Sequence, residues 1–469
     1  MTAAFVLYPE KKDLNNRLLI ALVIVAAAIY FMPPLAGIPA SMMHVAAVVF
    51  FTMTLLATGL LSEYVTALLF FLLATLLAIA PAPVVFSGFA SSTLWLVFGG
   101  LIVAEGVNST GLGKRVAAMV LGRFTLSYEM LIAVTVAFST ALAFVMPATL
   151  GRILLLLPVF GAVAEHAGLP RGSKGHDGVC LAAIMSTYQC GTAVLPANAP
   201  NLVLAGASET LYGVHLTYAE YLLVQFPIMG FVKGLVIALL TCWMMKEATR
   251  PVKEVYVRVA MRPEEWRLTI ILIAALVVWA TDVVHGIQPG WVALAAGLAC
   301  IFPTVGVMSP AVLNEKIRLG SFFYVAAVLG LGAVLSESDL AKEMGDGVHA
   351  LLHLERGSDF LNFMSLTLLS SSVGLLTTNP VQPALLAPLA GQFAEASGWP
   401  IKAALMTIAV GFTTIILPYQ VPPVVVGLQA AGLSLRTTLR FTVPLAIISA
   451  ILLVPLDYAW WKLIGYPSQ

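Results

Sequence analysis

The chain has 469 residues, of which 60% are hydrophobic and only 10% are charged, and its net charge is +1. Soluble domains have about 45–50% apolar and about 25% charged residues, so this composition excludes a soluble globular protein and indicates a polytopic membrane protein. The balanced charge gives no reason to expect nucleic acid as a partner.

Eleven apolar windows are long enough for a helix to cross about 30 Å of hydrocarbon, which takes about 20 residues. They lie at residues 17–37, 43–61, 64–82, 93–112, 179–206, 219–245, 267–286, 290–308, 320–338, 402–430 and 440–464. Two further apolar stretches, 129–165 and 360–390, have prolines and polar residues in their middles, so we expect each to form a re-entrant hairpin. The predicted fold is an all-α polytopic membrane protein with about 11 transmembrane helices and two re-entrant hairpins.

Lysine and arginine are concentrated in alternate loops, and basic residues accumulate on the cytoplasmic side of a membrane. Basic clusters occur before the first apolar window and between residues 246 and 267, whereas the loops at 83–92 and 207–218 contain no Lys or Arg. We therefore expect a cytoplasmic N-terminus (residues 1–16), a C-terminus outside, and a location in the cell inner (plasma) membrane.

The order of parts along the chain repeats once. The stretch TLWLVFGGLIVAEGVNSTGLGKRVA at 93–117 resembles SFFYVAAVLGLGAVLSESDLAKEMG at 321–345. Each copy is followed by an interrupted hairpin, a long broken helix and a last helix with a proline. The predicted repeats are residues 17–245 and 267–469, joined by a charged cytoplasmic linker at 246–266. One copy ends inside and the other outside, and such inverted repeats with broken helices are typical of secondary transporters.

The helices at 179–206 and 402–430 are broken by prolines, in the sequences PANAPN and VPPV. In lipid an unpaired backbone N–H or C=O costs several kcal/mol, so unwound backbone persists only where it lines a cavity or binds something. We therefore expect both breaks to hold ions or substrate near the middle of the membrane. The side-chain amides of Asn198 and Asn201 add donors and acceptors of both kinds.

The two hairpin tips are expected to face these breaks. In the first tip, Pro147 prevents a continuous helix, and Thr149 opens the second arm, where free amides and the positive dipole end favour an anion. The second tip is polar without being charged, and suits carboxylate or sulfate oxygens or a sodium ion, although a shallow polar turn is the simpler alternative. Its polar residues are Thr377, Thr378, Asn379 and Gln382.

Two basic residues lie inside apolar segments. Arg152 follows the first tip, and a charge at mid-bilayer costs about 2.5–3.5 kcal/mol on insertion scales. It either helps to bind an anionic substrate, or packs against backbone carbonyls or snorkels. Lys233 either supplies positive charge in place of a coupling ion, or snorkels or pairs with a carboxylate of another helix.

Other polar residues and the cysteines have plainer interpretations. Glu105 and Asn108 are expected to form a buried polar contact or to lie at the cytoplasmic interface. Asp282 and His285 are expected in a loop at the outer interface, with proton transfer as a secondary role for His285. The cysteines lie in apolar segments without metal-ligand spacing, which argues against disulfides or zinc. They are Cys180, Cys190, Cys242 and Cys300.

These motifs resemble the divalent anion/sodium symporter family, which contains dicarboxylate, citrate and sulfate carriers. The resemblance covers nearly the whole chain through WLVFGGLIVAEGVNSTGLGKRVA, WATDVVHGIQPGWVALAAGLACIFPTVGVMS, the two proline breaks and YAWWKLIG. In that family each hairpin tip carries Ser-Asn-Thr and each break a Thr-Pro-Pro-Asn-like turn, which together form one substrate site between two sodium sites. The resemblance also implies a homodimer with a scaffold and a domain that moves like an elevator.

This sequence departs from the family motifs. The tips read Pro147-Ala148-Thr149 and Thr378-Asn379-Pro380, and the breaks read Asn198-Ala199-Pro200-Asn201 and Val421-Pro422-Pro423-Val424. The expected substrate-binding residues are Thr149, Arg152, Asn198, Thr378, Asn379 and Pro422. The expected coupling-ion residues are Ala148, Ala197, Asn201, Thr377, Asn379, Gln382 and Val421. No cofactor other than sodium ions is expected, and the departures leave sodium stoichiometry and proton coupling open.

The leading interpretation is a secondary active transporter of small di- or trivalent anions, most simply di- or tricarboxylates, driven by a sodium or proton gradient. Alternatives are a carrier of sulfate or another inorganic oxyanion, an anion exchanger, or an ion channel. An intramembrane hydrolase needs a base or metal beside its nucleophile, and no His, Asp or Glu accompanies the Ser/Thr clusters at the tips. The expected partners are a small anion, the lipid bilayer and a second copy of the chain, and no enzymatic activity is expected.

Overall fold

The structure is a computed structural model that describes residues 9–33, 39–113, 115, 127–249 and 260–466. Every regular element in these ranges is helical. Seven helices within them are long and apolar enough to cross a membrane, and five shorter apolar helices accompany them. The predicted all-α polytopic membrane fold is therefore confirmed.

Each half of the chain begins with a set of helices that precede its hairpin. In the first half they are α1 (Pro9–Phe31), α2 (Ala40–Thr58), α3 (Glu63–Leu76), α4 (Ala82–Val85), η1 (Ser87–Ala90) and α5 (Ser92–Thr110). In the second half they are α13 (Pro263–Ala280), α14 (Asp282–His285), α15 (Pro289–Ile301), α16 (Val312–Glu315), α17 (Gly320–Glu337) and α18 (Asp339–Leu352).

Each half continues with a hairpin and then a broken helix. The first hairpin is α7 (Tyr128–Leu142) and α8 (Thr149–His166), and the second is α19 (Asp359–Leu376) followed by α20 (Val381–Leu386), η5 (Ala387–Leu389) and α21 (Ala390–Ser397). The first broken helix is α9 (Lys174–Gln189), η2 (Gly191–Ala193), η3 (Leu195–Ala197) and α10 (Ala199–Tyr212). The second is α22 (Ile401–Phe412), η6 (Pro418–Gln420) and α23 (Pro422–Ala430).

The last helix of each half contains a π-helical segment. The elements are α11 (Tyr218–Gln225), η4 (Phe226–Val232) and α12 (Lys233–Met245), and in the second half α24 (Leu435–Ile448), η7 (Ser449–Leu453) and α25 (Val454–Leu463). Pro227 lies in the first π-segment and Pro444 precedes the second. Proline lacks an N–H and its ring displaces a carbonyl one turn earlier, so the helix loosens locally instead of ending.

The prediction missed the 14-residue helix α18 and placed the end of the second hairpin too early. Residues 339–352 form the amphipathic helix α18, which packs against α17 and α21, where the sequence was interpreted only as a polar break. Its charged residues hid it from a search for apolar windows. The second arm of the second hairpin runs on to Ser397, beyond the expected end at residue 390.

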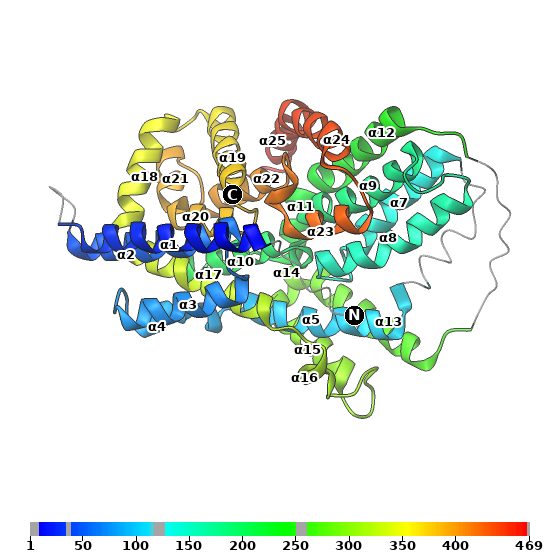
Figure 1. Ribbon diagram of the computed structural model, residues 1–469, viewed down its shortest axis with the longest axis horizontal. Helices are drawn as coiled ribbons and strands as arrows, with labels where there is room; N and C mark the ends of the chain where they lie inside the picture. Colours follow the sequence, from blue (N-terminus) through cyan, green and yellow to red (C-terminus); the bar gives the residue numbers. More distant parts are fainter. Residues whose placement is uncertain (1–8, 34–38, 114, 116–126, 250–259, 467–469) are drawn as a thin grey trace.

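The early helices of the two halves cross-pack through glycines. Helix α5 packs against α15, and α17 packs against α3 and α4. A Cβ atom on Gly99 would lie 2.3 Å from the backbone of Ala293, and one on Gly330 would lie 2.1 Å from the Val85 carbonyl oxygen. Only glycine allows backbones to approach this closely. Figure 1 shows α3, α4, α5, α13 and α15 along one side of the molecule, with the hairpins and broken helices on the other.

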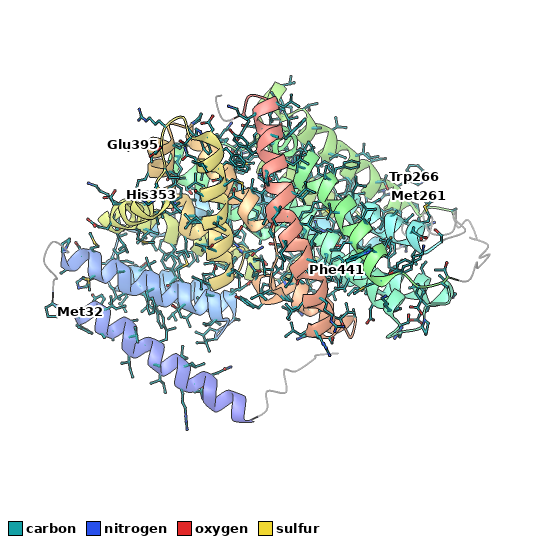
Figure 2. The ribbon with its side chains drawn as sticks, turned by 90° about the horizontal axis from the view of Figure 1, so that it is seen from above. Met32, Met261, Trp266, His353, Glu395 and Phe441 are labelled. Atoms are coloured by element: carbon teal, nitrogen blue, oxygen red, sulfur yellow. The ribbon has the colours of Figure 1, made fainter. Side chains whose placement is uncertain are left out.

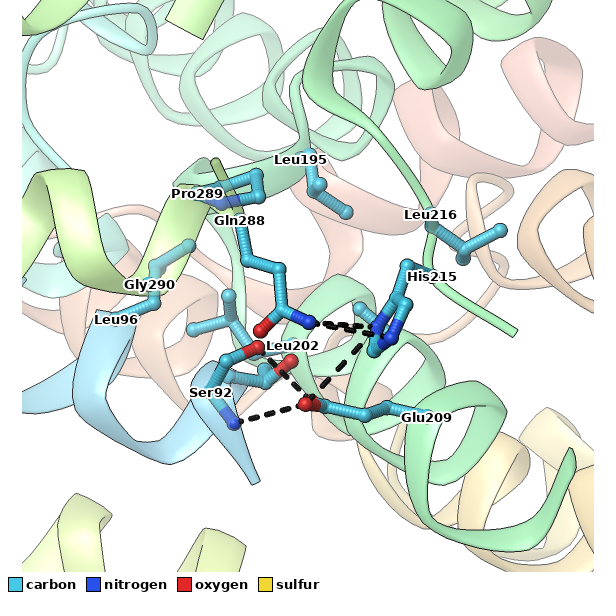
Figure 3. Close-up of a pocket in the computed structure, with 12 residues that line it drawn as sticks. Ser92, Leu96, Leu195, Leu202, Glu209, His215, Leu216, Gln288, Pro289 and Gly290 are labelled. Carbon is cyan, nitrogen blue, oxygen red and sulfur yellow. Dashed lines mark hydrogen bonds and ion pairs between the residues drawn. The ribbon is translucent and has the colours of Figure 1, made fainter. Parts of the chain in front are cut away.

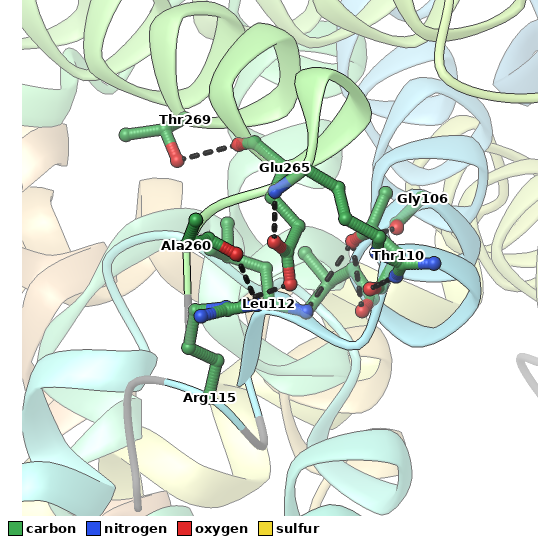
Figure 4. Close-up of polar contacts among 9 residues, drawn as sticks. Gly106, Thr110, Leu112, Arg115, Ala260, Glu265 and Thr269 are labelled. Atoms are coloured by element: carbon green, nitrogen blue, oxygen red, sulfur yellow. Dashed lines mark hydrogen bonds and ion pairs between the residues drawn. The ribbon is translucent and has the colours of Figure 1, made fainter. Parts of the chain in front are cut away.

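The start of the second half is fastened to the end of α5. Arg115 forms an ion pair of 2.8 Å with Glu265 in the first turn of α13 (Figure 4). The other Glu265 oxygen accepts a hydrogen bond of 2.7 Å from the Arg262 amide, which caps α13. Arg262 and Glu265 lie within residues 246–266, the segment expected to be a charged linker, and α13 begins inside this segment at Pro263.

Large apolar side chains cover the outer faces of the last helices. Leu239 and Trp243 on α12 are 70% and 80% exposed, and Ile451 in η7 is 73% exposed. Helix α1, at whose end Met32 lies, occupies one margin of the molecule in Figure 2 and packs against α2. Apolar surface of this extent suits contact with lipid.

Candidate functional site

Both hairpin tips and both breaks line one central cavity of about 330 Å³. The early helices α5 and α17, together with Glu63 at the start of α3, form the rest of its wall. The lining residues from the tips and breaks are Pro147, Ala148, Thr149, Pro380, Ala199, Pro200, Val421, Pro422 and Pro423. Segments separated by more than two hundred residues therefore share one chamber, as the sequence predicted for the tips and the breaks.

Three helices begin at this cavity. Thr149, Ala199 and Pro422 are the first residues of α8, α10 and α23, and all three line it. The first N–H groups of a helix have no partner within the helix, and the helix dipole places partial positive charge at the same end. Pro422 and Pro423 have no N–H, and the Val424 and Val425 amides donate to the Val421 carbonyl, so α23 contributes only its dipole. The N-termini of α8 and α10 contribute amides as well, and together the three ends favour an anion.

Asn198 is the centre of the first break. Its side-chain oxygen accepts hydrogen bonds from the Thr149 hydroxyl and, at 2.9 Å, from Arg152 Nη2. Its side-chain nitrogen donates to the Tyr188 carbonyl at 3.0 Å. Because every polar atom of this fully buried amide is engaged, the unwound segment is fixed to the hairpin tip.

Arg152 is fully buried and bonded to backbone oxygens. Nη1 donates to the Met146 carbonyl at 2.6 Å, and Nη2 donates to the Thr187 carbonyl at 3.1 Å. These oxygens belong to the first tip and to the end of α9. Arg152 packs against carbonyls in this conformation and lies behind Thr149 and Asn198, since it is not among the residues that line the cavity.

Asn379 is the centre of the second tip. Its backbone N–H donates to the Gln420 carbonyl at 2.8 Å, and its side-chain nitrogen donates to the Phe412 carbonyl at 2.8 Å. Its side-chain oxygen accepts a hydrogen bond of 2.8 Å from Gln382, whose own oxygen accepts one from Ser370 at 3.1 Å. The second tip is thus joined to the second break by neutral groups alone.

Tyr188 connects the two halves of the site. Its carbonyl accepts the hydrogen bond from Asn198, and its hydroxyl accepts one of 2.8 Å from the side-chain nitrogen of Asn379. It also lines the cavity. Tyr188 was not predicted from the sequence, because an aromatic residue at the end of an apolar helix is more often a core residue. Its position directly before the break was the available signal.

The remaining predicted residues lie around the same centre. The Ala197 carbonyl accepts a hydrogen bond of 3.3 Å from Thr149. Asn201 donates to the Val194 carbonyl at 2.8 Å, and its buried side-chain oxygen has no hydrogen-bond partner in the described part of the chain. Thr377 donates to a carbonyl in its own helix at 2.8 Å, and Thr378 is half-buried.

Lys233 lies behind the second break. It is fully buried, and its ammonium donates to the Thr413 carbonyl at 2.6 Å, with the Thr413 and Thr414 hydroxyls at 3.4 and 3.5 Å. It therefore holds the carbonyl end of α22 instead of extending to the surface.

The other polar residues singled out in the sequence have structural contacts. Glu105 forms an ion pair of 3.2 Å with Lys316, and Asn108 is exposed. Asp282 is buried and caps α11 by accepting hydrogen bonds from the Tyr218 and Ala219 amides. No group of three or more His, Cys, Asp or Glu that could hold a metal ion occurs among the residues the structure describes.

A second polar group, the Glu209 cluster, joins the first broken helix to the early helices (Figure 3). Glu209 on α10 accepts hydrogen bonds from the hydroxyls of Ser91 and Ser92 at 2.7 and 3.0 Å and from the Ser92 amide at 3.2 Å. His215 lies 4.0 Å from Glu209, and Gln288 lies 3.1 Å from His215. The carboxylate thus caps the N-terminus of α5 from another element, a contact that no sequence pattern indicated.

Comparisons with known proteins agree with this architecture. A family model described as the sodium:sulfate symporter transmembrane region matches residues 12–466. A membrane protein of Cupriavidus necator is 23% identical over 401 residues, which cover 81% of this chain and 76% of that protein. The L-tartrate/succinate antiporter of Escherichia coli (strain K12) is 23% identical over 279 residues, 55% of each chain. The crystal structure of the Alcanivorax borkumensis YdaH transporter aligns with a TM-score of 0.57 at 16% identity, covers 81% of this chain and 87% of that one, and shows similarity of fold.

Proposed function

The chain belongs to the sodium:sulfate symporter family, and we propose that it is a secondary active transporter of small di- and trivalent anions. This is the family that its motifs resemble, so the predicted membership is confirmed. The chain is a multi-pass membrane transporter and not an enzyme.

The convergence of three helix N-termini on the central cavity carries the proposal. The substrate would lie between the first turns of α8, α10 and α23, where the amides of α8 and α10 and the dipoles of all three helices favour negative charge. Thr149 lines the cavity at the start of α8, and its hydroxyl, which donates its proton to Asn198 in this conformation, would have to turn toward the anion to bind it. Asn198, Asn379 and Tyr188 would hold the tips and breaks in the geometry that the anion requires.

Di- or tricarboxylates are the substrates we favour over sulfate. Much of the cavity wall is aliphatic, with Val97 and Leu101 from α5, Val325 from α17 and Val421 from the second break. Such a wall can pack against the carbon chain between two carboxylates, whereas an inorganic oxyanion has no apolar part to pack against it. The relative named an L-tartrate/succinate antiporter supports the same substrate class.

Arg152 is proposed to act as a fixed positive charge beside the first break. Its guanidinium donates hydrogen bonds to the Met146 and Thr187 carbonyls. Backbone carbonyl oxygens are also typical ligands of a hard cation, so Arg152 would occupy the place of a coupling ion. A fixed charge at this point favours a carrier that needs fewer sodium ions, or an anion exchanger. The unpartnered Asn201 oxygen is the candidate ligand for any coupling cation that remains.

Transport is proposed to occur by an elevator movement within a homodimer with cytoplasmic N-termini. The hairpins and broken helices would move as one body past the early helices, which form the opposite wall of the cavity. The cross-packed α5, α15, α3 and α17 supply the rigid surface that such a movement needs.

Uptake into proteoliposomes tests the proposal. We expect saturable uptake of labelled succinate, weaker competition by sulfate, and loss of at least about tenfold in uptake with Asn379→Ala, because about 1.4 kcal/mol of lost binding is tenfold. Asn108→Ala is the matched control, since this exposed asparagine lies outside the cavity. Equal uptake by Asn379→Ala and the wild type, or no saturable uptake of succinate, citrate or sulfate, would contradict it.

A further inference from the structure

A single charged side chain lies in the described wall of the central cavity, and its charge is negative. Glu63 is the first residue of α3, and all the other described residues that line the cavity are uncharged. The basic residues near the breaks, Arg152 and Lys233, do not line it. A carboxylate therefore borders the space in which the anion is proposed to bind, and like charges repel.

The charge of Glu63 is not cancelled by a salt bridge. Its side chain forms no ion pair or hydrogen bond within the described part of the chain, and it is exposed, so water can hydrate the carboxylate. Two basic residues precede α17, the helix that packs against α3. Lys316 is paired with Glu105 at 3.2 Å, and Arg318 forms no ion pair with a described residue.

Glu63 belongs to the early helices, which are proposed to stay in place during transport. Helix α3 packs against α17, and the ring of Tyr64 meets that of Phe323 edge to face, with centroids 5.5 Å apart. The carboxylate would therefore stay behind when the anion crosses, so it cannot carry a proton or a cation along with the anion. Its effect is confined to the binding of the anion in the cavity.

The size of the cavity limits how far a bound anion can lie from Glu63. A compact cavity of 330 Å³ places any anion inside it within about 10 Å of a lining carboxylate. At this separation, with an effective dielectric constant between those of water and of a protein surface, each negative charge on the anion weakens its binding by about fivefold. A trianion thus loses about fivefold more affinity than a dianion of similar shape.

We propose that Glu63 determines which anion charge this carrier accepts, and that it favours dicarboxylate dianions over tricarboxylate trianions. The helix ends at the cavity attract both classes, whereas the carboxylate adds a repulsion that grows with the charge of the substrate. This inference rests on the proposed transport function. Glu63 also lies in the first turn of α3, where a carboxylate stabilises the helix, so the test must separate selectivity from stability.

The test compares succinate with tricarballylate, which is succinate that carries one carboxymethyl group, at pH 8, where carboxyl groups are ionised. Uptake of labelled succinate into proteoliposomes gives KM, and competition by unlabelled tricarballylate gives Ki. Relative to the wild type, Glu63→Gln should lower the ratio of Ki to KM about fivefold, and Glu63→Lys, which changes two units of charge, about 25-fold. Glu63→Asp keeps the charge and should keep the wild-type ratio.

Glu264→Gln is the matched control, since Glu264 lies in the first turn of α13, another early helix, and does not line the cavity. It should keep the wild-type ratio, and size-exclusion elution and thermal unfolding establish that each variant is folded. An unchanged ratio in folded Glu63→Gln or Glu63→Lys, or an equal fall in Glu264→Gln, overturns the selectivity and leaves the transport function standing. Absence of saturable wild-type uptake of succinate, citrate and sulfate overturns both.

Discussion

The two breaks have the same backbone design but are stabilised by different side chains. At the first break, Asn198 is bonded to Arg152, a permanent charge supplied by the hairpin of the same half. At the second break, Asn379 is bonded to the neutral Gln382, and the nearby charge of Lys233 comes from the last helix of the other half. The comparison indicates that the two breaks share one backbone geometry. They differ in the source of the nearby positive charge, which is Arg152 of the adjacent hairpin at the first break and Lys233 of a distant helix at the second.

The largest expected effect comes from removing the charge at the first break. Arg152→Ala removes a charged donor from the Met146 and Thr187 carbonyls and leaves the Asn198 oxygen with the Thr149 hydroxyl alone. Hydrogen bonds to charged groups contribute about 1.5–3 kcal/mol each, so the free energy of unfolding should fall by about 3 kcal/mol or more, and succinate uptake should be nearly lost. Thermal unfolding and proteoliposome uptake measure the two effects.

Arg152→Lys separates the effect of the charge at the first break from the effect of the hydrogen bonds. Lysine restores the charge but not the fork of donors that reaches three oxygens, so partial recovery of uptake is expected. If Arg152→Ala had the stability and uptake kinetics of the wild type, Arg152 would neither stabilise the first break nor contribute to transport.

The connection between the halves is expected to give an intermediate effect. Tyr188→Phe deletes the hydroxyl that accepts from Asn379 and leaves the backbone contact with Asn198 intact. One neutral hydrogen bond contributes about 1 kcal/mol, so the apparent affinity for succinate should fall about fivefold. In a double-mutant cycle with Asn379→Ala the two losses should not add, whereas full additivity would show that the contact does not couple the halves.

A smaller effect is expected at the Glu209 cluster. Glu209→Gln keeps the shape of the side chain but weakens its contact with the N-terminus of α5, by about 0.5–1 kcal/mol. If the broken helices move past α5, this change should shift the balance between conformations, measured by the accessibility of a single cysteine introduced in the cavity. Glu395→Gln, at an exposed position, is the control and should leave the accessibility unchanged.

The smallest effect is expected from the ion pair between Glu105 and Lys316. Lys316 is half-exposed, and exposed pairs contribute about 0–1 kcal/mol. Glu105→Gln should therefore change the melting temperature by only a few degrees and leave uptake intact. A large loss of transport would show that this contact has a functional role.

The sequence predicted the features that follow from solvation and missed those that follow from three-dimensional assembly. Prolines and asparagines inside apolar segments identified the breaks and tips, because lipid forbids unpaired backbone. Tyr188 and Glu209 gave no such signal, since their importance comes from partners 191 and 117 residues away. For Arg152 the sequence left two alternatives open, and only the positions of the surrounding carbonyls show which contacts it makes here.

The single most direct test is an experimental structure of the protein in lipid nanodiscs with saturating succinate. We predict density for the anion in the central cavity, between the first turns of α8, α10 and α23, with Thr149 in contact. Density for succinate elsewhere in the molecule, with the central cavity filled by lipid or by side chains, would contradict the assignment of the tips and breaks as one anion site.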